Sequence, residues 1–75
     1  MERYKNLTGG SGVSAFELGR DSITVEFNDG SRYLYNSQNA GQDNIEQMKA
    51  LAARGSGLNA FINTHVKKAY AAKLR

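Results

Sequence analysis

The tripeptide Asn28-Asp29-Gly30 limits what this chain can fold into more than any other feature of the sequence. Apolar and polar residues alternate over residues 22–28, and the run 31–36 that follows is rich in aromatic residues. Asn, Asp and Gly between two such runs are typical of the tight turn of a β-hairpin, because they tolerate positive backbone φ angles. The sequence therefore predicts two antiparallel strands joined by this turn.

The length of the turn decides which side chains share a face of the sheet. A two-residue turn would put Arg32 on the apolar face. A three-residue loop with Gly30 in the left-handed region shifts the pairing by one residue, which reverses the facing of every side chain. In that register Glu26 lies opposite Arg32, a favourable pair of opposite charges, and Val25 lies opposite Tyr33. We therefore expect the three-residue loop.

The rest of the chain predicts one more strand and two helices. Residues 13–19 include a short alternating run and form the first strand. Residues 43–54 carry apolar side chains at helical spacing, and Gly55 is placed to end that helix in the left-handed conformation. A second helix is expected from Ser56, because the apolar residues of 58–70 recur at intervals of three and four.

The expected fold class is α+β: a three-stranded antiparallel β-meander followed by two α-helices packed on one sheet face (βββαα). We expect a flexible N-terminal lead-in over residues 1–12, where glycines cluster, and a single folded domain over residues 13–75. The side chains expected in the core are Phe16, Leu18, Ile23, Val25, Phe27, Tyr33, Tyr35, Ile45, Met48, Leu51, Leu58, Phe61, Ile62, Val66 and Tyr70.

Several classes of protein are excluded by what the 75 residues lack. The chain has no cysteine and 1 histidine, which excludes disulfide scaffolds and thiolate chemistry and argues against a histidine metal site. Its carboxylates show no spacing typical of an acid–base pair or a metal site, so we expect no catalytic residues, no metal and no cofactor. No apolar run approaches about 18 residues and no secretory signal is recognisable, so we expect a cytoplasmic protein without a membrane segment.

Charge is distributed unevenly along the chain. Residues 1–46 carry 4 Lys or Arg and 7 Asp or Glu, whereas residues 47–75 carry 6 Lys or Arg and no carboxylate. A basic surface of this kind attracts phosphate backbones, although the same residues are also typical of an ordinary solvated helix face. The candidate nucleic-acid-binding residues are Lys49, Arg54, Lys67, Lys68, Lys73 and Arg75.

Two further features have both a structural and a functional interpretation. Tyr33 and Tyr35 lie on one face of their strand, where aromatic rings can stack on bases or fill a core. The three-residue turn places them on the apolar face, which favours the core. His65, the one histidine, lies within the apolar arc of the second helix with no nucleophile or orienting partner nearby in the sequence. We expect a packed or hydrogen-bonded structural role for it.

A series of short motifs follows a characteristic order through most of the chain. They are Ser11 and Val13; Ile23-Thr24-Val25-Glu26-Phe27; Gly30; Tyr33-Leu34-Tyr35; Gly55; Leu58-Asn59; Ile62; and Val66 with Tyr70. In this order the chain resembles the KTSC domain, a small module named from the C-terminus of some lysyl-tRNA synthetases. The association with a synthetase implies RNA as a partner. The residues to which the resemblance assigns a structural role are Tyr33, Tyr35, Gly55, Asn59 and Tyr70.

Two functions of different classes follow from these observations. The first is a non-catalytic module that binds nucleic acid, RNA in preference to DNA, through a basic helical surface. The alternative is a protein-interaction or self-associating module, such as a homodimer, because a three-stranded sheet leaves long edges that invite pairing. Cations on one continuous face would favour RNA, whereas scattered cations beside an exposed apolar patch would favour a protein partner.

Overall fold

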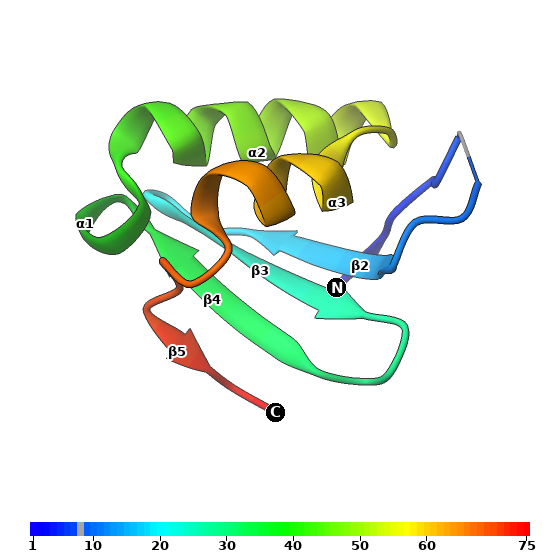
Figure 1. The fold of residues 1–75 in the computed structure, drawn as a ribbon, viewed down its shortest axis with the longest axis horizontal. Coiled ribbons are helices and arrows are strands. Elements are labelled where there is room, and N and C mark those ends of the chain that lie inside the picture. The colour runs from blue at the N-terminus through cyan, green and yellow to red at the C-terminus, as the bar shows by residue number, and fades with distance from the viewer. Residues whose placement is uncertain (8) are drawn as a thin grey trace.

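The computed structural model describes residues 1–7 and 9–75, and in this part of the chain an antiparallel sheet of five strands carries helices on one face (Figure 1). The strands follow one another in the order β1-β2-β3-β4-β5. In chain order the elements are β1 Glu2–Arg3, β2 Val13–Leu18, β3 Ser22–Phe27, β4 Arg32–Asn36, α1 Ser37–Ala40, α2 Gln42–Arg54, α3 Leu58–Phe61, the π-helical turn η1 Ile62–Val66, and β5 Ala72–Lys73. The α+β class is therefore confirmed, with two more strands than expected.

The β3–β4 hairpin has the register that the three-residue turn predicts. Val25 lies opposite Tyr33, and Glu26 lies opposite Arg32. Gly30 has a φ of 90°, the left-handed region that this loop requires. The side chains of Glu26 and Arg32 form an ion pair with 3.5 Å between Oε2 and Nε. Turn chemistry and alternation therefore placed the centre of the sheet correctly.

The core lies between the sheet and the helices that cover it. Ile23 and Val25 of the central strand β3 are 0% exposed, as are Ile45 and Met48 of α2, which packs against β3 and β4. Apolar spacing of two in a strand and three to four in a helix puts these residues on facing surfaces. The buried hydrophobic residues are Tyr4, Val13, Phe16, Ile23, Val25, Tyr35, Ala40, Ile45, Met48, Ala52, Leu58, Ile62 and Val66.

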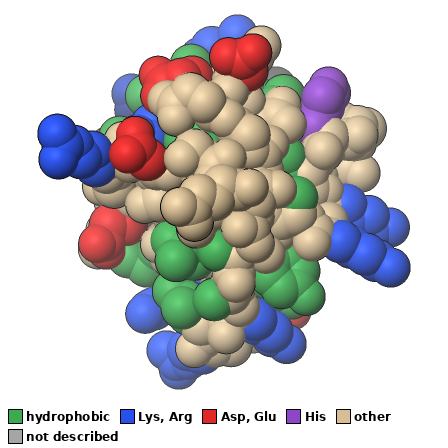
Figure 2. All heavy atoms as spheres, turned by 90° about the vertical axis from the view of Figure 1, so that its left-hand side faces the viewer, with side chains coloured by type: hydrophobic (Ala, Val, Ile, Leu, Met, Phe, Trp, Pro, Cys, Tyr) green, Lys and Arg blue, Asp and Glu red, His purple; other side chains and the backbone are tan. Residues whose placement is uncertain are grey.

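Two residues expected in the core, Leu18 and Tyr70, lie outside it. Leu18 is 48% exposed because it ends β2, past the point where β1 pairs with that strand. Tyr70 is 36% exposed because it follows the last helical turn. Leu74 is 54% exposed. Figure 2 shows hydrophobic side chains at the surface in the lower half of one face of the molecule.

The N-terminal lead-in expected over residues 1–12 needs correction. Glu2–Arg3 forms β1 along the outer edge of β2. Tyr4 is only 4% exposed, and its hydroxyl accepts a hydrogen bond of 3.2 Å from the backbone N–H of Leu58. The first residues therefore belong to the folded domain, because Tyr4 adds an aromatic ring to the core. The expectation for Thr8 lies outside the described residues.

The second predicted helix is also shorter than expected. α3 and η1 end at Val66, and the chain turns back to form β5 beside β4. The backbone N–H of Ala71 donates to the carbonyl of Leu34 at 2.7 Å, and that of Leu74 donates to the carbonyl of Arg32 at 2.7 Å. The free edge of β4 thus satisfies backbone groups that a continued helix would have paired internally.

The helical layer begins earlier than its apolar pattern indicates. A short helix, α1, precedes the first predicted helix. It starts after Asn36, whose side-chain oxygen accepts the backbone N–H of Asn39 at 2.9 Å. Gly55 ends α2 with a φ of 85°, as expected. Over the described residues, no helix has the length and apolar character needed to cross a bilayer.

Candidate functional site

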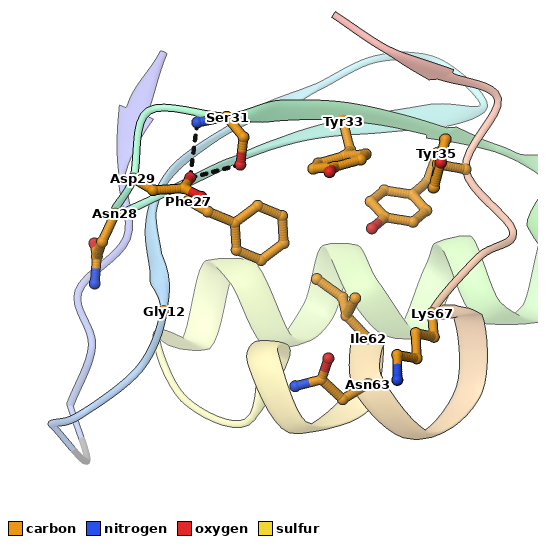
Figure 3. A pocket seen from close by; sticks show the side chains of 11 residues that line it. Gly12, Phe27, Asn28, Asp29, Ser31, Tyr33, Tyr35, Ile62, Asn63 and Lys67 are labelled. Atoms are coloured by element: carbon orange, nitrogen blue, oxygen red, sulfur yellow. Dashed lines mark hydrogen bonds between the residues drawn. The ribbon is translucent and has the colours of Figure 1, made fainter. Parts of the chain in front are cut away.

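An open cleft of about 410 Å³ lies between the β3–β4 hairpin and the helical segment that covers it (Figure 3). Tyr33 and Tyr35 of β4 form one wall, and Ile62 and Asn63 of η1 face them from the other side. Lys67 lines the cleft just after η1. The volume falls within the range of small-ligand sites, roughly 300 to 1,000 Å³.

Four aromatic rings form one connected group along this cleft. Tyr70 packs edge to face on Tyr33, with 4.8 Å between ring centroids, and on Tyr35, with 6.4 Å. Phe27 contacts Tyr33 in the same manner at 5.7 Å. Tyr35 is 2% exposed and belongs to the core, as expected, whereas Tyr33 is only partly buried. The exposed Tyr70 and the half-buried Tyr33 therefore offer aromatic surface to a ligand.

The Tyr35 phenol gives the cleft wall a measurable pH dependence. Burial raises the pKa of Tyr35 to about 12, from 10.0, and the neighbouring Tyr33 and Tyr70 add to the effect. The phenol proton of Tyr35 is lost at a lower pH in the unfolded chain than in the folded one. The protonated phenol therefore stabilises the folded state fully below pH 10, and this stabilisation is lost as the pH rises towards 12. In thermal unfolding followed by circular dichroism, we expect the melting temperature of Tyr35→Phe to fall less over this interval than that of the wild type. Parallel curves would contradict this.

The tip of the hairpin supplies a fixed negative charge. The hydroxyl and the backbone N–H of Ser31 donate to Oδ1 of Asp29 at 2.6 and 2.9 Å. These hydrogen bonds, with a smaller contribution from the charge of Lys73, hold the pKa of the Asp29 carboxyl below its usual range. Asp29 and Ser31 both line the cleft. This end of the cleft therefore presents an ionised hydrogen-bond acceptor.

Lysines lie at the other end of the cleft and along its border. Lys67 lines the cleft and Lys68 follows it, both exposed after η1. Nζ of Lys73 lies 5.8 Å from the centroid of the Tyr33 ring, a cation–π contact. Arg75 is exposed next to β4, since its backbone carbonyl accepts the N–H of Arg32 at 3.2 Å. Lys73 and Arg75 thus extend the basic surface onto the sheet edge rather than onto a helix.

The other two predicted site residues lie elsewhere. Nζ of Lys49 donates to the carbonyl of Arg20, in the β2–β3 turn, at 2.7 Å. Nε of Arg54 donates to Oγ of Ser56, after the end of α2, at 3.0 Å. Neither cation lines the cleft. Figure 2 shows Lys and Arg side chains in several separate places around this face. Because Lys49 and Arg54 lie away from the cleft, the six predicted residues do not all meet there.

The residues expected to have structural roles are placed as follows. His65 is exposed rather than packed in the apolar face, but its Nδ1 lies 2.8 Å from Oγ1 of Thr64 and its ring stacks on Phe61 with 4.3 Å between centroids. Asn59 is half-buried at the end of a smaller hollow beside the N-terminal glycines. Among the described residues, no group of three His, Cys, Asp or Glu side chains could hold a metal ion.

The geometry defines the class of protein: a small α+β domain with a cleft that has an aromatic wall, a carboxylate at one end and lysines at the other. No protein-family model, curated protein or solved structure is significantly similar to this chain. Membership of the KTSC family therefore stays a prediction from the motifs. The sequence analysis named Lys67 as a candidate site residue, assigned Tyr33 and Tyr35 to the core, and missed Asp29 and Asn63, which only the fold brings together.

Proposed function

We propose that this protein is a non-catalytic, KTSC-like RNA-binding domain whose final segment contacts phosphate groups. The observation that carries the proposal is the concentration of exposed cations in residues 67–75, a segment without a carboxylate. Two of these cations lie beside the aromatic cleft. Cations that track a backbone next to aromatic rings are typical of proteins that bind single-stranded nucleic acid. The four residues are Lys67, Lys68, Lys73 and Arg75.

The resemblance to the KTSC domain supports RNA over DNA. Aromatic side chains bind unpaired bases by stacking, which favours a single strand over a double helix as the ligand. The proposed contacts to phosphate are electrostatic, so they position the chain without selecting a sequence. Lys49 and Arg54, which lie apart from the cleft, are not needed for this interaction.

The double variant Lys67→Glu/Lys68→Glu tests the proposal. We expect its affinity for a fluorescent single-stranded RNA to fall by about tenfold to a hundredfold at low salt, equally for different sequences. The slope of log affinity against log salt should become shallower by about 1.4, because each contact with a single strand contributes roughly 0.7. Fluorescence anisotropy at several salt concentrations measures both quantities.

The variant Lys49→Glu/Arg54→Glu is the matched control, because it changes the net charge by the same amount on another part of the surface. It should lose clearly less affinity. Equal losses in the two variants would show that net charge, and not the final segment, determines binding. Undetectable binding of the wild type at low salt would contradict RNA binding altogether.

The protein-interaction alternative is favoured by one observation, the exposure of apolar side chains in the same final segment. Leu74 is 54% exposed and Tyr70 is 36% exposed. The argument from exposed strand edges is weaker. β1 and β5 cover the edges of the three long strands, and each is only 2 residues long. A dimeric mass in analytical ultracentrifugation, together with absent RNA binding, would support this alternative.

A further inference from the structure

We infer that the cleft binds one unpaired nucleotide, with its base against the aromatic wall, the donor groups of the base at Asp29 and its phosphate at Lys67. The inference rests on the proposed RNA binding and adds what the cleft itself recognises. Figure 3 places Asp29 and Lys67 at opposite ends of the cleft. Tyr33 and Tyr35 lie on the side of the cleft formed by the sheet, opposite the helical wall.

The aromatic wall fits a flat, conjugated ligand. Tyr70 keeps 36% of its surface exposed although it contacts two other rings, so it still offers surface to a ligand. Tyr33 contacts the rings of Phe27 and Tyr70 and the ammonium group of Lys73. These contacts fix the orientation of its ring without a ligand. Rings fixed in advance lose little conformational entropy when a base stacks on them.

The charges at the two ends give the ligand a direction. Ser31 holds Oδ1 of Asp29, which leaves Oδ2 of this ionised carboxylate able to accept hydrogen bonds. A carboxylate repels phosphate but accepts N–H groups, which every nucleobase carries on its Watson–Crick edge. Lys67, at the opposite end, attracts phosphate. A nucleotide has this same polarity, with N–H donors at one end and a negative charge at the other.

Other classes of ligand fit these groups less well. A wholly apolar ligand would remove Asp29 and Lys67 from water without replacing their hydrogen bonds, which is unfavourable. A ligand with negative charge at both ends would be repelled by the carboxylate of Asp29. A nucleotide satisfies the aromatic wall, the carboxylate and the lysine together, so it is the occupant that the chemistry of the cleft favours.

An RNA octamer and an abasic octamer of ribose phosphates separate the base from the backbone, because both carry the same charge. We expect wild-type protein to bind the RNA about fivefold to a hundredfold more tightly than the abasic chain. Tyr70→Leu should remove most of this ratio while keeping the affinity for the abasic chain. Asp29→Asn should also lower the ratio, because the base loses a charged acceptor and the phosphates lose a repulsive neighbour.

Phe61→Leu is the control, since Phe61 is an aromatic residue of the helical layer that does not line the cleft. It should keep the full ratio, and circular dichroism should show all variants folded. Equal affinity of the wild type for the two octamers would overturn the inference and leave phosphate binding intact. An unchanged ratio in Tyr70→Leu would also overturn it. Binding to neither octamer would overturn the proposed function and the inference together.

Discussion

Tyr4→Ala is expected to lower the free energy of unfolding by about 3 to 5 kcal/mol, the usual range for removal of a buried aromatic side chain. The ring of Tyr4 is 4% exposed, and its hydroxyl is the hydrogen-bond acceptor of the buried N–H of Leu58. A domain of this size has a total stability of roughly 4 to 11 kcal/mol, so the loss is a large fraction of it. Urea unfolding followed by circular dichroism measures the change.

Tyr4→Phe separates the two contributions. It keeps the ring and removes only the acceptor of the Leu58 N–H, which should cost about 1 to 3 kcal/mol because that donor stays buried. If Tyr4→Ala changed stability by no more than about 0.5 kcal/mol, as surface substitutions do, the packing of the N-terminal segment described above would be wrong.

Gly55→Ala is expected to cost about 2 to 4 kcal/mol, the second largest effect. Gly55 has a φ of +85°, where an alanine is strained by about 1 to 2 kcal/mol. A Cβ atom at this position would also lie 2.6 Å from Cβ of Lys5, so the N-terminal segment would have to move. That movement would disturb the hydrogen bond of 2.7 Å that the backbone N–H of Leu7 donates to the carbonyl of Gly55.

Gly30→Ala is a control with the same backbone strain and no such contact. Gly30 has a φ of +90°, and an added Cβ would meet no atom within 4 Å. Its cost should therefore be limited to about 1 to 2 kcal/mol. The difference between the two alanine variants measures the contact with Lys5. Equal losses of stability would indicate that the segment around Lys5 moves aside freely.

The centre of the fold could be predicted because the forces that set it are local. Alternation over β3, the turn residues before β4 and the left-handed glycine fix the register between strands that are neighbours in sequence. The buried face of α2 could also be predicted from the sequence, since Ile45 and Met48 are buried where helical spacing places them. Gly55 ends this helix for the same local reason.

The ends of the chain could not be predicted, because their partners are distant in sequence. Tyr4 meets Leu58 across 54 positions, and no pattern near Tyr4 indicates that contact. After Val66 the spacing of Ala69 and Tyr70 still suits a helix. The chain leaves the helix there, and β5, which follows, pairs with the edge of β4. Tertiary hydrogen bonds thus overrode a local pattern, as they often do at the end of an element.

The candidate site was predictable only in part for a related reason. Charge along the chain identified Lys67 as a candidate, whereas alternation placed Tyr33 on the apolar face and so assigned it to the core. Asp29 was recognised only as a turn residue, although the same carboxylate lines the cleft. Asn63 carries no signal of its own, because it becomes a cleft residue only when η1 packs over the hairpin.

β1 and β5 lie at the two edges of the sheet, and from this position we expect a particular order of folding and opening. The strands of the meander β2-β3-β4 are joined by tight turns, whereas the whole helical layer separates β4 from β5, and β1 and β5 are only 2 residues long each. We therefore expect the meander to form early in folding and the outer strands to join last. We also expect them to separate first in the native state, so that their amide protons exchange with solvent sooner than those of β3. A ligand held between Tyr33 and Lys67 would slow that exchange in β5, which carries Lys73.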